Sequence, residues 1–164
     1  QYTAPAALAP HYETQEAIMS LIHSTAACVI QRGEHFLMVE EQRGGPHSVF
    51  NQPAGHIEPG EGPIAAILRE VQEETAWRVS LTSYLGLYIF HTDDGQTFHS
   101  HGFIAAPLRQ LDLALDPDIV ATHWLTLEQL RELDQQSRLR SPLVLKRIED
   151  ALSGPCYPLT VIRE

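Results

Sequence analysis

Residues 55–79 read GHIEPGEGPIAAILREVQEETAWRV, and the rest of the chain is organised around this stretch. Its centre carries Glu70, Glu73 and Glu74, at spacings of three and four residues. On a helix those spacings place all three carboxylates on one face. Like charges so placed weaken an isolated helix by roughly 0.2–0.5 kcal/mol per pair. The pattern therefore indicates a helix face that holds a cation, and oxygen ligands favour Mg²⁺ or Mn²⁺ over zinc.

The residues around the acids predict where this helix begins and which side it buries. Pro63 suits a first-turn position, because its missing N–H has no helical partner there. Residues 64–68 and Val71 supply an apolar face. Gly55 allows the backbone to approach the cation closely, and Arg69 can pair with a neighbouring carboxylate.

The stretch resembles the Nudix box, G-x5-E-x7-R-E-U-x-E-E-x-G-U, in which U is a bulky apolar residue. The matching positions are Gly55, Glu61, Arg69, Glu70, Val71, Glu73 and Glu74. Ala76 replaces the last glycine of the motif and Trp77 replaces its final aliphatic residue, but neither change removes an acid. The alternative is a solvated acidic helix face. A match of this length with four acids in register is a far more specific signal than that.

The resemblance implies an α/β Nudix fold, an α/β/α sandwich with a mixed β-sheet, over residues 21–164. The pattern agrees, because strand-like segments surround one central helix and two further helices follow late in the chain. Strands are expected at 21–30, 35–40, 78–91, 96–107 and 119–125, with helices capped by Thr126 and Ser141. Residues 1–20, rich in Ala and Pro, are expected to form a weakly structured N-terminal extension.

The resemblance also assigns roles within the box. The expected metal ligands are the carbonyl of Gly55 and the carboxylates of Glu70, Glu73 and Glu74, with Glu70 and Glu74 as the main pair. Phosphoryl transfer needs positioning and charge neutralisation more than covalent chemistry, and one carboxylate can take a proton from the attacking water. The expected catalytic residues are Glu70, Glu73 and Arg69, with Glu73 a further ligand or the base. Arg69 would orient Glu73 or Glu61.

Residues outside the helix are candidates with open alternatives. Arg43 could reach a phosphate or be a solvated loop arginine, and His56 could contact phosphate or pack in its loop. Gln52 is a further candidate for substrate binding, and Arg140 could bind phosphate or pack at a helix end. Nudix enzymes often recruit an additional acid to the metals. The candidates for that acid are Asp116, Asp118 and Glu61, against the alternative of solvated acids.

Three further segments point to a branch of the family. FNQPAGHIE (50–58), LRSPLV (139–144) and the tail SG-x-x-YPL (153–159) resemble the NudJ phosphatase branch. That branch implies hydrolysis of the pyrimidine pyrophosphate of thiamine biosynthesis and of nucleoside tri- and diphosphates. The alternatives are another Nudix specificity, for ADP-ribose or oxidised nucleotides, and a non-catalytic Nudix-fold binding module. Loss of box acids would favour the last, and none is lost.

Composition bounds the remaining possibilities. The formal net charge of −10 argues against a binder of nucleic-acid polymers, which needs a basic surface. A small phosphorylated substrate is compatible with that charge, because divalent cations dominate the local field. The two cysteines fit no metal spacing, and no apolar run is long enough for a membrane span. A cytoplasmic monomer or homodimer is expected.

Overall fold

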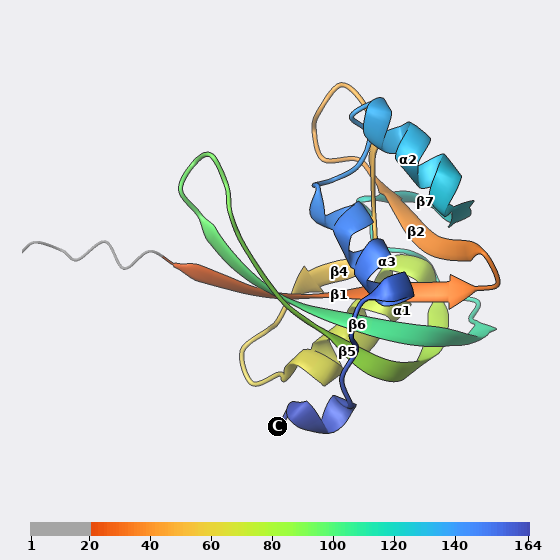
Figure 1. Ribbon diagram of the computed structural model, residues 1–164. Helices are drawn as coiled ribbons and strands as arrows, with labels where there is room; N and C mark the ends of the chain where they lie inside the picture. The colour runs from red at the N-terminus through yellow and green to blue at the C-terminus, as the bar shows by residue number, and fades with distance from the viewer. Residues whose placement is uncertain (1–20) are drawn as a thin grey trace, which may run out of the picture.

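The computed structural model describes residues 21–164. Seven strands, three α-helices and a short 3₁₀ turn follow one another along those residues (Figure 1). In chain order they are β1 (Ile22–Arg32), β2 (His35–Glu41), β3 (Val49–Asn51), β4 (Ala54–His56), α1 (Pro63–Thr75), β5 (Trp77–His91), β6 (Thr97–Gln110), β7 (Ile119–Thr126), α2 (Leu127–Gln135), α3 (Leu143–Ser153) and η1 (Leu159–Val161).

The strands form one mixed sheet with the order β3-β2-β1-β6-β5, in which β4 pairs with β1 and β7 pairs with β2. β1 runs parallel to β6, whereas its pairings with β2 and β4 are antiparallel. The hairpins predicted around residues 31–34 and 93–95 are confirmed by the antiparallel β1–β2 and β5–β6 pairs. β6 continues to Gln110, three residues beyond its predicted end.

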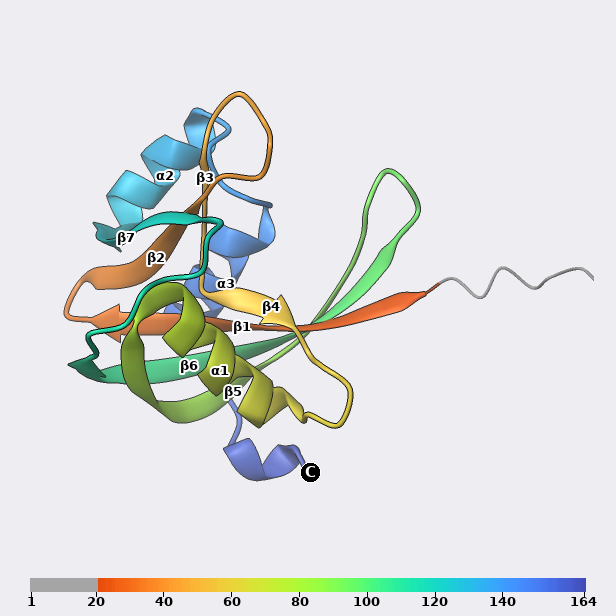
Figure 2. The ribbon, with the colours of Figure 1, turned by 180° about the vertical axis from the view of Figure 1, so that it is seen from behind.

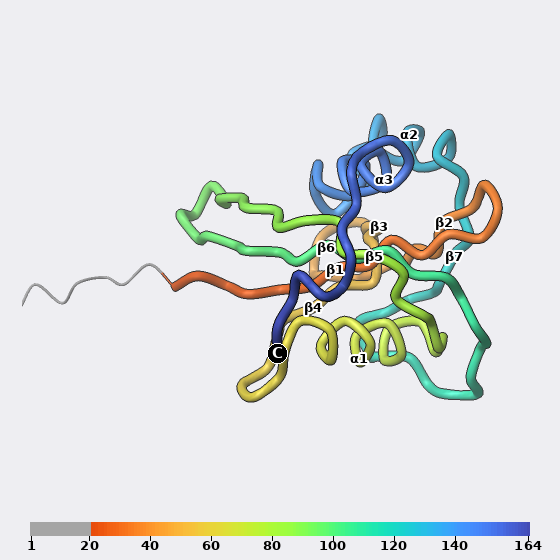
Figure 3. The backbone as a smooth tube through the Cα atoms, turned by 60° about the horizontal axis from the view of Figure 1, so that its bottom comes forward, coloured from red at the N-terminus to blue at the C-terminus, as the bar shows by residue number. Residues whose placement is uncertain are grey.

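Helices cover both faces of the sheet, with α1 on one side and α2 and α3 on the other (Figure 3). One apolar core joins the sheet to α1 and includes Cys28 and Ile67. The other lies against α2 and α3 and includes Val29, Leu130 and Ile148. Cys28 and Val29 belong to different cores because successive strand residues point to opposite faces. The predicted α/β/α sandwich with a mixed sheet is confirmed.

α1 begins as the sequence predicts, with Pro63 in its first turn. The helix ends at Ala76, which takes a left-handed conformation (φ 55°, ψ 29°) and donates its N–H to the Gln72 carbonyl at 2.9 Å. Glycine adopts this conformation without strain, whereas alanine pays for its Cβ. Ala76, at the position of the glycine in the Nudix box, therefore takes a conformation that favours glycine, at a cost in backbone strain.

The start of α3 differs from the prediction that Ser141 caps it and Pro142 is its first residue. Pro142 stands in the capping place with helical angles (φ −57°, ψ −21°), and no side chain caps the helix. The backbone carbonyl of Ser141 accepts from the Val144 N–H at 3.1 Å instead. The Thr126 cap of α2 is confirmed, since its side chain accepts from the Gln129 N–H and forms a capping box.

Two further expectations concern the N-terminal extension and membrane-spanning segments. The predicted extension at residues 1–20 lies outside the described residues. Of the helices found from residue 21 onward, none has the length and apolar character that a membrane crossing requires.

Candidate active site

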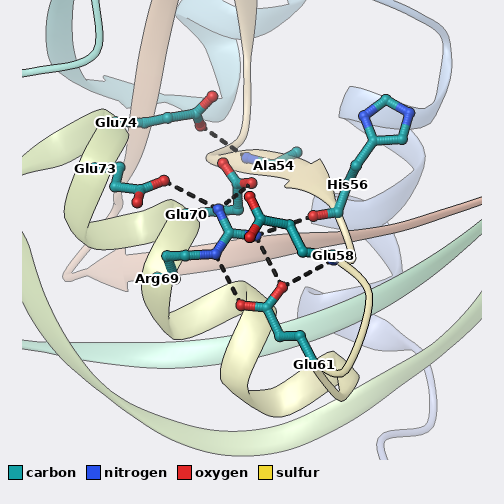
Figure 4. A network of polar contacts seen from close by, with 8 residues as sticks. All are labelled: Ala54, His56, Glu58, Glu61, Arg69, Glu70, Glu73 and Glu74. Atoms are coloured by element: carbon teal, nitrogen blue, oxygen red, sulfur yellow. Dashed lines mark hydrogen bonds and ion pairs between the residues drawn. The ribbon is translucent and has the colours of Figure 1, made fainter.

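Arg69 of α1 is the centre of a network of charged groups from the helix and the loop before it (Figure 4). Its Nε and Nη2 donate to the two carboxylate oxygens of Glu61 at 2.8 and 2.9 Å. Its Nη1 donates to Glu70 at 2.7 Å and to Glu73 at 3.0 Å. Nη2 also donates to the His56 carbonyl at 3.0 Å, which ties the helix to β4. One guanidinium thus holds three carboxylates in place and fixes the loop that leads into the helix.

The Arg69 network shifts the protonation of the acids it contacts. The hydrogen bonds from Arg69, with one from the Glu58 backbone, lower the pKa of Glu61 to about 2. The same carboxylates raise the pKa of Arg69 above its ordinary range, so it stays charged. Burial raises the pKa of Glu70, although Arg69 opposes that change. Glu61 is therefore an ionised anchor for Arg69, while Glu70 lies in a less polar environment.

Gly55 and Glu70 meet where β4 passes α1. A Cβ on Gly55 would lie 2.1 Å from the Glu70 carboxyl carbon, well inside van der Waals contact. The strand and the Glu70 side chain approach this closely only because residue 55 has no side chain. The backbone of Gly55 and the carboxylate of Glu70 therefore line the same wall.

Glu74 lies one helical turn further along and is nearly fully buried. Its Oε2 accepts from the Ala54 N–H at 2.9 Å. Burial raises its pKa to about 9, and the neighbouring charges of Glu41 and Glu70 act in the same direction. Glu74 was expected to form the main ligand pair with Glu70; one of its carboxylate oxygens is engaged by β4, and its role as a ligand stays a prediction.

The loop before β7 brings Asp116 to the helix. Carboxylate oxygens of Glu70, Glu73 and Asp116 all lie within 4.8 Å of one another. The approach is fixed by the backbone, since the Asp116 N–H donates to the Glu73 carbonyl at 3.0 Å. Of the three candidates for an additional acid, Asp116 is the one in this cluster. Asp118 lines the nearby cavity, and Glu61 is held by Arg69.

A cavity of about 440 Å³ opens beside these acids, between β4, α1 and the loop before β7. Its lining includes Gly55, Glu70, Glu74, Asp116 and Asp118. Such a set of hard oxygen donors fits Mg²⁺ or Mn²⁺ and does not fit zinc, which prefers nitrogen and sulfur. The acids outnumber Arg69, so a divalent cation would relieve their mutual repulsion.

A second cavity, of about 670 Å³, adjoins the first and shares Arg43 and residues 54–56 with it. Arg140 lines it from the loop before α3, and His56 from β4. Arg43 also pairs with the fully buried Glu41 at 2.8 Å. The structure thus places three of the predicted substrate-binding residues around one space next to the acidic cluster. This placement agrees with a role in binding substrate.

The fourth candidate, Gln52, is placed elsewhere. It is buried, and its amide donates to the Val144 carbonyl of α3 at 2.7 Å. Its side-chain oxygen accepts from Arg147 at 3.4 Å. Gln52 therefore holds α3 against the sheet, because its amide is used in internal contacts.

Sequence reasoning overlooked Arg147, which is only 5% exposed and lines the second cavity from α3. A Lys-Arg pair at 146–147 reads as surface charge. Its position in the helix could have indicated burial, because Val144, Arg147 and Ile148 follow the i, i+3, i+4 pattern of a buried helix stripe.

The NUDIX domain family matches residues 21–145 of the chain. The chain belongs to the Nudix hydrolase family. The match includes β1 to β7, α1 and α2, and therefore every acid described above.

Relatives of this Nudix hydrolase point to one kind of enzyme. The phosphatases NudJ of Escherichia coli K12 and of Shigella flexneri are each 37% identical over 142 residues, covering 85% of this chain and 90% of theirs. The solved structure of a NUDIX hydrolase from Nitrosomonas europaea aligns with a TM-score of 0.83 and 35% identity, covering 88% of this chain and 97% of that one. The chain is thus an enzyme of the Nudix type and a homologue of the NudJ phosphatases.

Proposed function

We propose that this Nudix hydrolase uses Mg²⁺, with Mn²⁺ as a substitute, to cleave a pyrophosphate bond in small phosphorylated molecules. The substrates proposed are the pyrimidine pyrophosphate of thiamine biosynthesis and nucleoside tri- and diphosphates. The observation that carries the proposal is the cluster of Glu70, Glu73 and Asp116 oxygens within 4.8 Å of one another. The cluster lies beside the first cavity, and Arg43 lines both this cavity and the second one.

The cluster gives each acid a proposed role. Glu70, Glu73 and Asp116 would hold the cation together with the Gly55 carbonyl, and Glu74 would join them on losing its proton. The bound cation would polarise the phosphoryl oxygens and lower the pKa of the attacking water. Glu73 is the most exposed carboxylate in the Arg69 network, at 42% of its side chain, so it is the acid best placed to accept a proton from that water.

The arginines divide into a positioning residue and substrate contacts. Arg69 orients Glu61, Glu70 and Glu73 through its hydrogen bonds, so it acts through the acids. Arg43 and Arg140 line the second cavity and would neutralise the phosphates that the cation does not reach. The proposal includes no direct substrate contact for Gln52, because its amide is engaged with α3.

The choice of substrate rests on the likeness to the NudJ phosphatases and on the segments shared with that branch. It is tested by a panel assayed with Mg²⁺, in which orthophosphate and pyrophosphate are scored separately. The panel contains the thiamine-pathway pyrimidine pyrophosphate, nucleoside di- and triphosphates, and ADP-ribose. A Glu70→Gln variant serves as the control for contaminating phosphatases.

Release of orthophosphate from the pyrimidine pyrophosphate and from nucleoside diphosphates is the expected result. Activity confined to ADP-ribose would overturn the proposed substrate and leave the Nudix chemistry intact. A protein that binds Mg²⁺ and hydrolyses nothing in the panel would contradict the proposed function as a whole.

A further inference from the structure

Arg147 is a buried cation without an acidic partner. The salt bridges formed by residues 21–164 do not include it. Its Nε is the only buried side-chain nitrogen or oxygen in that range without a hydrogen-bond partner. A charge removed from water is costly unless it is paired and hydrogen-bonded. The positive charge of Arg147 is thus uncompensated, and an electron-rich group of a ligand in the cavity that the residue lines would offset it.

The groups around Arg147 hold it without neutralising it. Nη2 donates to the Ser100 hydroxyl at 2.9 Å, and Nη1 donates to the Gln52 amide oxygen at 3.4 Å. The guanidinium carbon lies 5.4 Å from the centre of the Tyr88 ring. Burial lowers its pKa to about 10, so the group is still charged at neutral pH. The side chain is therefore fixed in a charged form by three neutral partners, and it lines the second cavity.

The sheet register places Arg147 relative to the acids. His56 of β4 pairs with Thr25 of β1, and Thr25 pairs with Ser100 of β6. The three residues therefore lie side by side on neighbouring strands, with their side chains on the same face of the sheet. Gly55, next to His56, faces the other way, toward Glu70. Two strand spacings separate β4 from Ser100, a distance of about 10 Å. Figure 2 shows β4 beside β1, with α1 in front of the sheet.

That separation decides which part of a substrate meets Arg147. A phosphate held at the acidic cluster lies on the Gly55 side of β4. A diphosphate is too short to reach from there across two strands, so the organic end of the substrate fills the far part of the cavity. Phe98 lies between His23 and Phe90, stacked at 4.7 and 4.8 Å, so both its faces are covered and only its edge lines the space.

We infer that Arg147 binds the heteroaromatic ring of the substrate, its guanidinium donating to a ring carbonyl or ring nitrogen. The ring would lie against the edge of Phe98, with its acceptor toward α3. This inference rests on the proposed function, because the same cavity holds the leaving group of the same reaction. It assigns Arg147 to substrate specificity and leaves the chemistry to the acids of α1.

The test compares ring-bearing and ring-free ligands in wild type, Arg147→Met and Arg147→Lys. Cytidine diphosphate and inorganic tripolyphosphate are the two substrates. Cytidine monophosphate and inorganic phosphate are titrated calorimetrically without metal, which reads binding independently of turnover. Lys146→Met is the matched control, because Lys146 is the exposed neighbour on α3 and pairs only with Asp150 among the salt bridges of the described chain.

The expected result for Arg147→Met is a KM for cytidine diphosphate raised by about tenfold or more, as for loss of a hydrogen bond to a charged group. Its kcat changes by less than about threefold, since the acids are untouched. The KM for tripolyphosphate and the affinity for inorganic phosphate should not change. The affinity for cytidine monophosphate should fall by the same factor as the KM for cytidine diphosphate rises. Arg147→Lys keeps the positive charge but loses the planar guanidinium with its several donors. Its KM for cytidine diphosphate should therefore lie between the values for wild type and Arg147→Met.

Two outcomes would overturn the inference. An equal loss for ring-bearing and ring-free ligands would assign Arg147 to a phosphate. A fall in thermal stability of both variants with no selective change in cytidine monophosphate affinity would make it a structural residue. Failure of the proposed function is a separate result, because a wild-type protein that hydrolyses neither substrate can still show the Arg147-dependent binding of cytidine monophosphate.

Discussion

The Glu70 carboxylate occupies the place that a side chain on Gly55 would need. A Cβ at that position would come within 2.1 Å of both the carboxyl carbon and one oxygen of Glu70. Helix α1 and strand β4 can therefore approach this closely only because residue 55 has no side chain. The contact is between backbone and the far end of a flexible side chain, so it positions a functional group more than it supports the fold.

Gly55→Ala is expected to displace the Glu70 carboxylate while the protein stays folded. A misplacement of about 1 Å at a reacting centre can cost about 100-fold in rate, so kcat/KM with Mg²⁺ should fall by at least that factor. Calorimetric titration with Mn²⁺ should show weaker binding. Gly45→Ala is the matched control, since its Cβ would meet nothing closer than the His47 carbonyl at 3.8 Å. Equal activity in the two variants would mean that Glu70 is not part of the site.

Asp116 and Asp118 provide a paired test of the metal cluster, because both line the cavity and only Asp116 belongs to the cluster. Asp116→Asn should weaken Mn²⁺ binding by about tenfold or more and lower kcat, since it removes a charged oxygen donor. Asp118→Asn removes the same charge two residues away and should change Mn²⁺ affinity by less than about threefold, as a screened charge does. Parallel Mn²⁺ titrations of the two variants measure this difference. A larger loss of Mn²⁺ affinity in Asp118→Asn than in Asp116→Asn would place the cation nearer Asp118.

The sequence predicted those features of the fold that follow from local pattern. The start of α1 follows from Pro63, and the long hairpin follows from its Asp-Gly turn. The start of α3 was misplaced because Ser141 uses its backbone carbonyl, and a sequence does not distinguish that contact from a side-chain cap. The family resemblance supplied the layers and the mixed sheet, which no local pattern encodes.

The site was less accessible to sequence reasoning because it depends on contacts between distant segments. Asp116 was one of three candidates until the loop before β7 was seen to hydrogen-bond to the Glu73 carbonyl. Gln52 had the chemistry of a ligand contact, but it is buried against α3. Arg147 was not among the candidates, although its helical position lies in a buried stripe. In each case tertiary packing decided which polar groups face the cavity.

Arg69→Met should destabilise the metal-free protein, because three carboxylates lose the cation that holds them together. Hydrogen bonds to charged groups contribute about 1.5–3 kcal/mol each at most, so a loss of several degrees in Tm is expected. Thermal unfolding with a chelator present measures it. Arg131→Met is the control, because its exposed pair with Glu149 spans 3.9 Å and should contribute less than about 1 kcal/mol. Equal Tm values for the two variants would show that the Arg69 network is too solvated to matter for stability.

The same network predicts how stability depends on pH. Arg69 lowers the pKa of Glu61 to about 2 in the folded protein, against about 4.5 for an ordinary glutamate. The unfolded chain therefore binds this proton more readily, so the contribution of Glu61 is fully present above pH 4.5 and is lost as pH falls toward 2. Glu61→Gln removes that titration. Urea denaturation from pH 7 to pH 3 should show wild type more stable than Glu61→Gln by a constant amount above about pH 5, and by a shrinking amount below it.

Glu34→Gln controls for the loss of one negative charge, since Glu34 lies in the exposed turn between β1 and β2. Its stability difference from wild type should lack the decline that Glu61→Gln shows in acid, because no arginine is hydrogen-bonded to its carboxylate among the contacts of residues 21–164. A Glu61→Gln difference that stays constant down to pH 3 would mean that the Glu61–Arg69 pair does not lower the pKa of Glu61 in solution. Arg69 would then not be held in one position by Glu61. Its hydrogen bonds would not explain why Glu70 and Glu73 keep a fixed spacing.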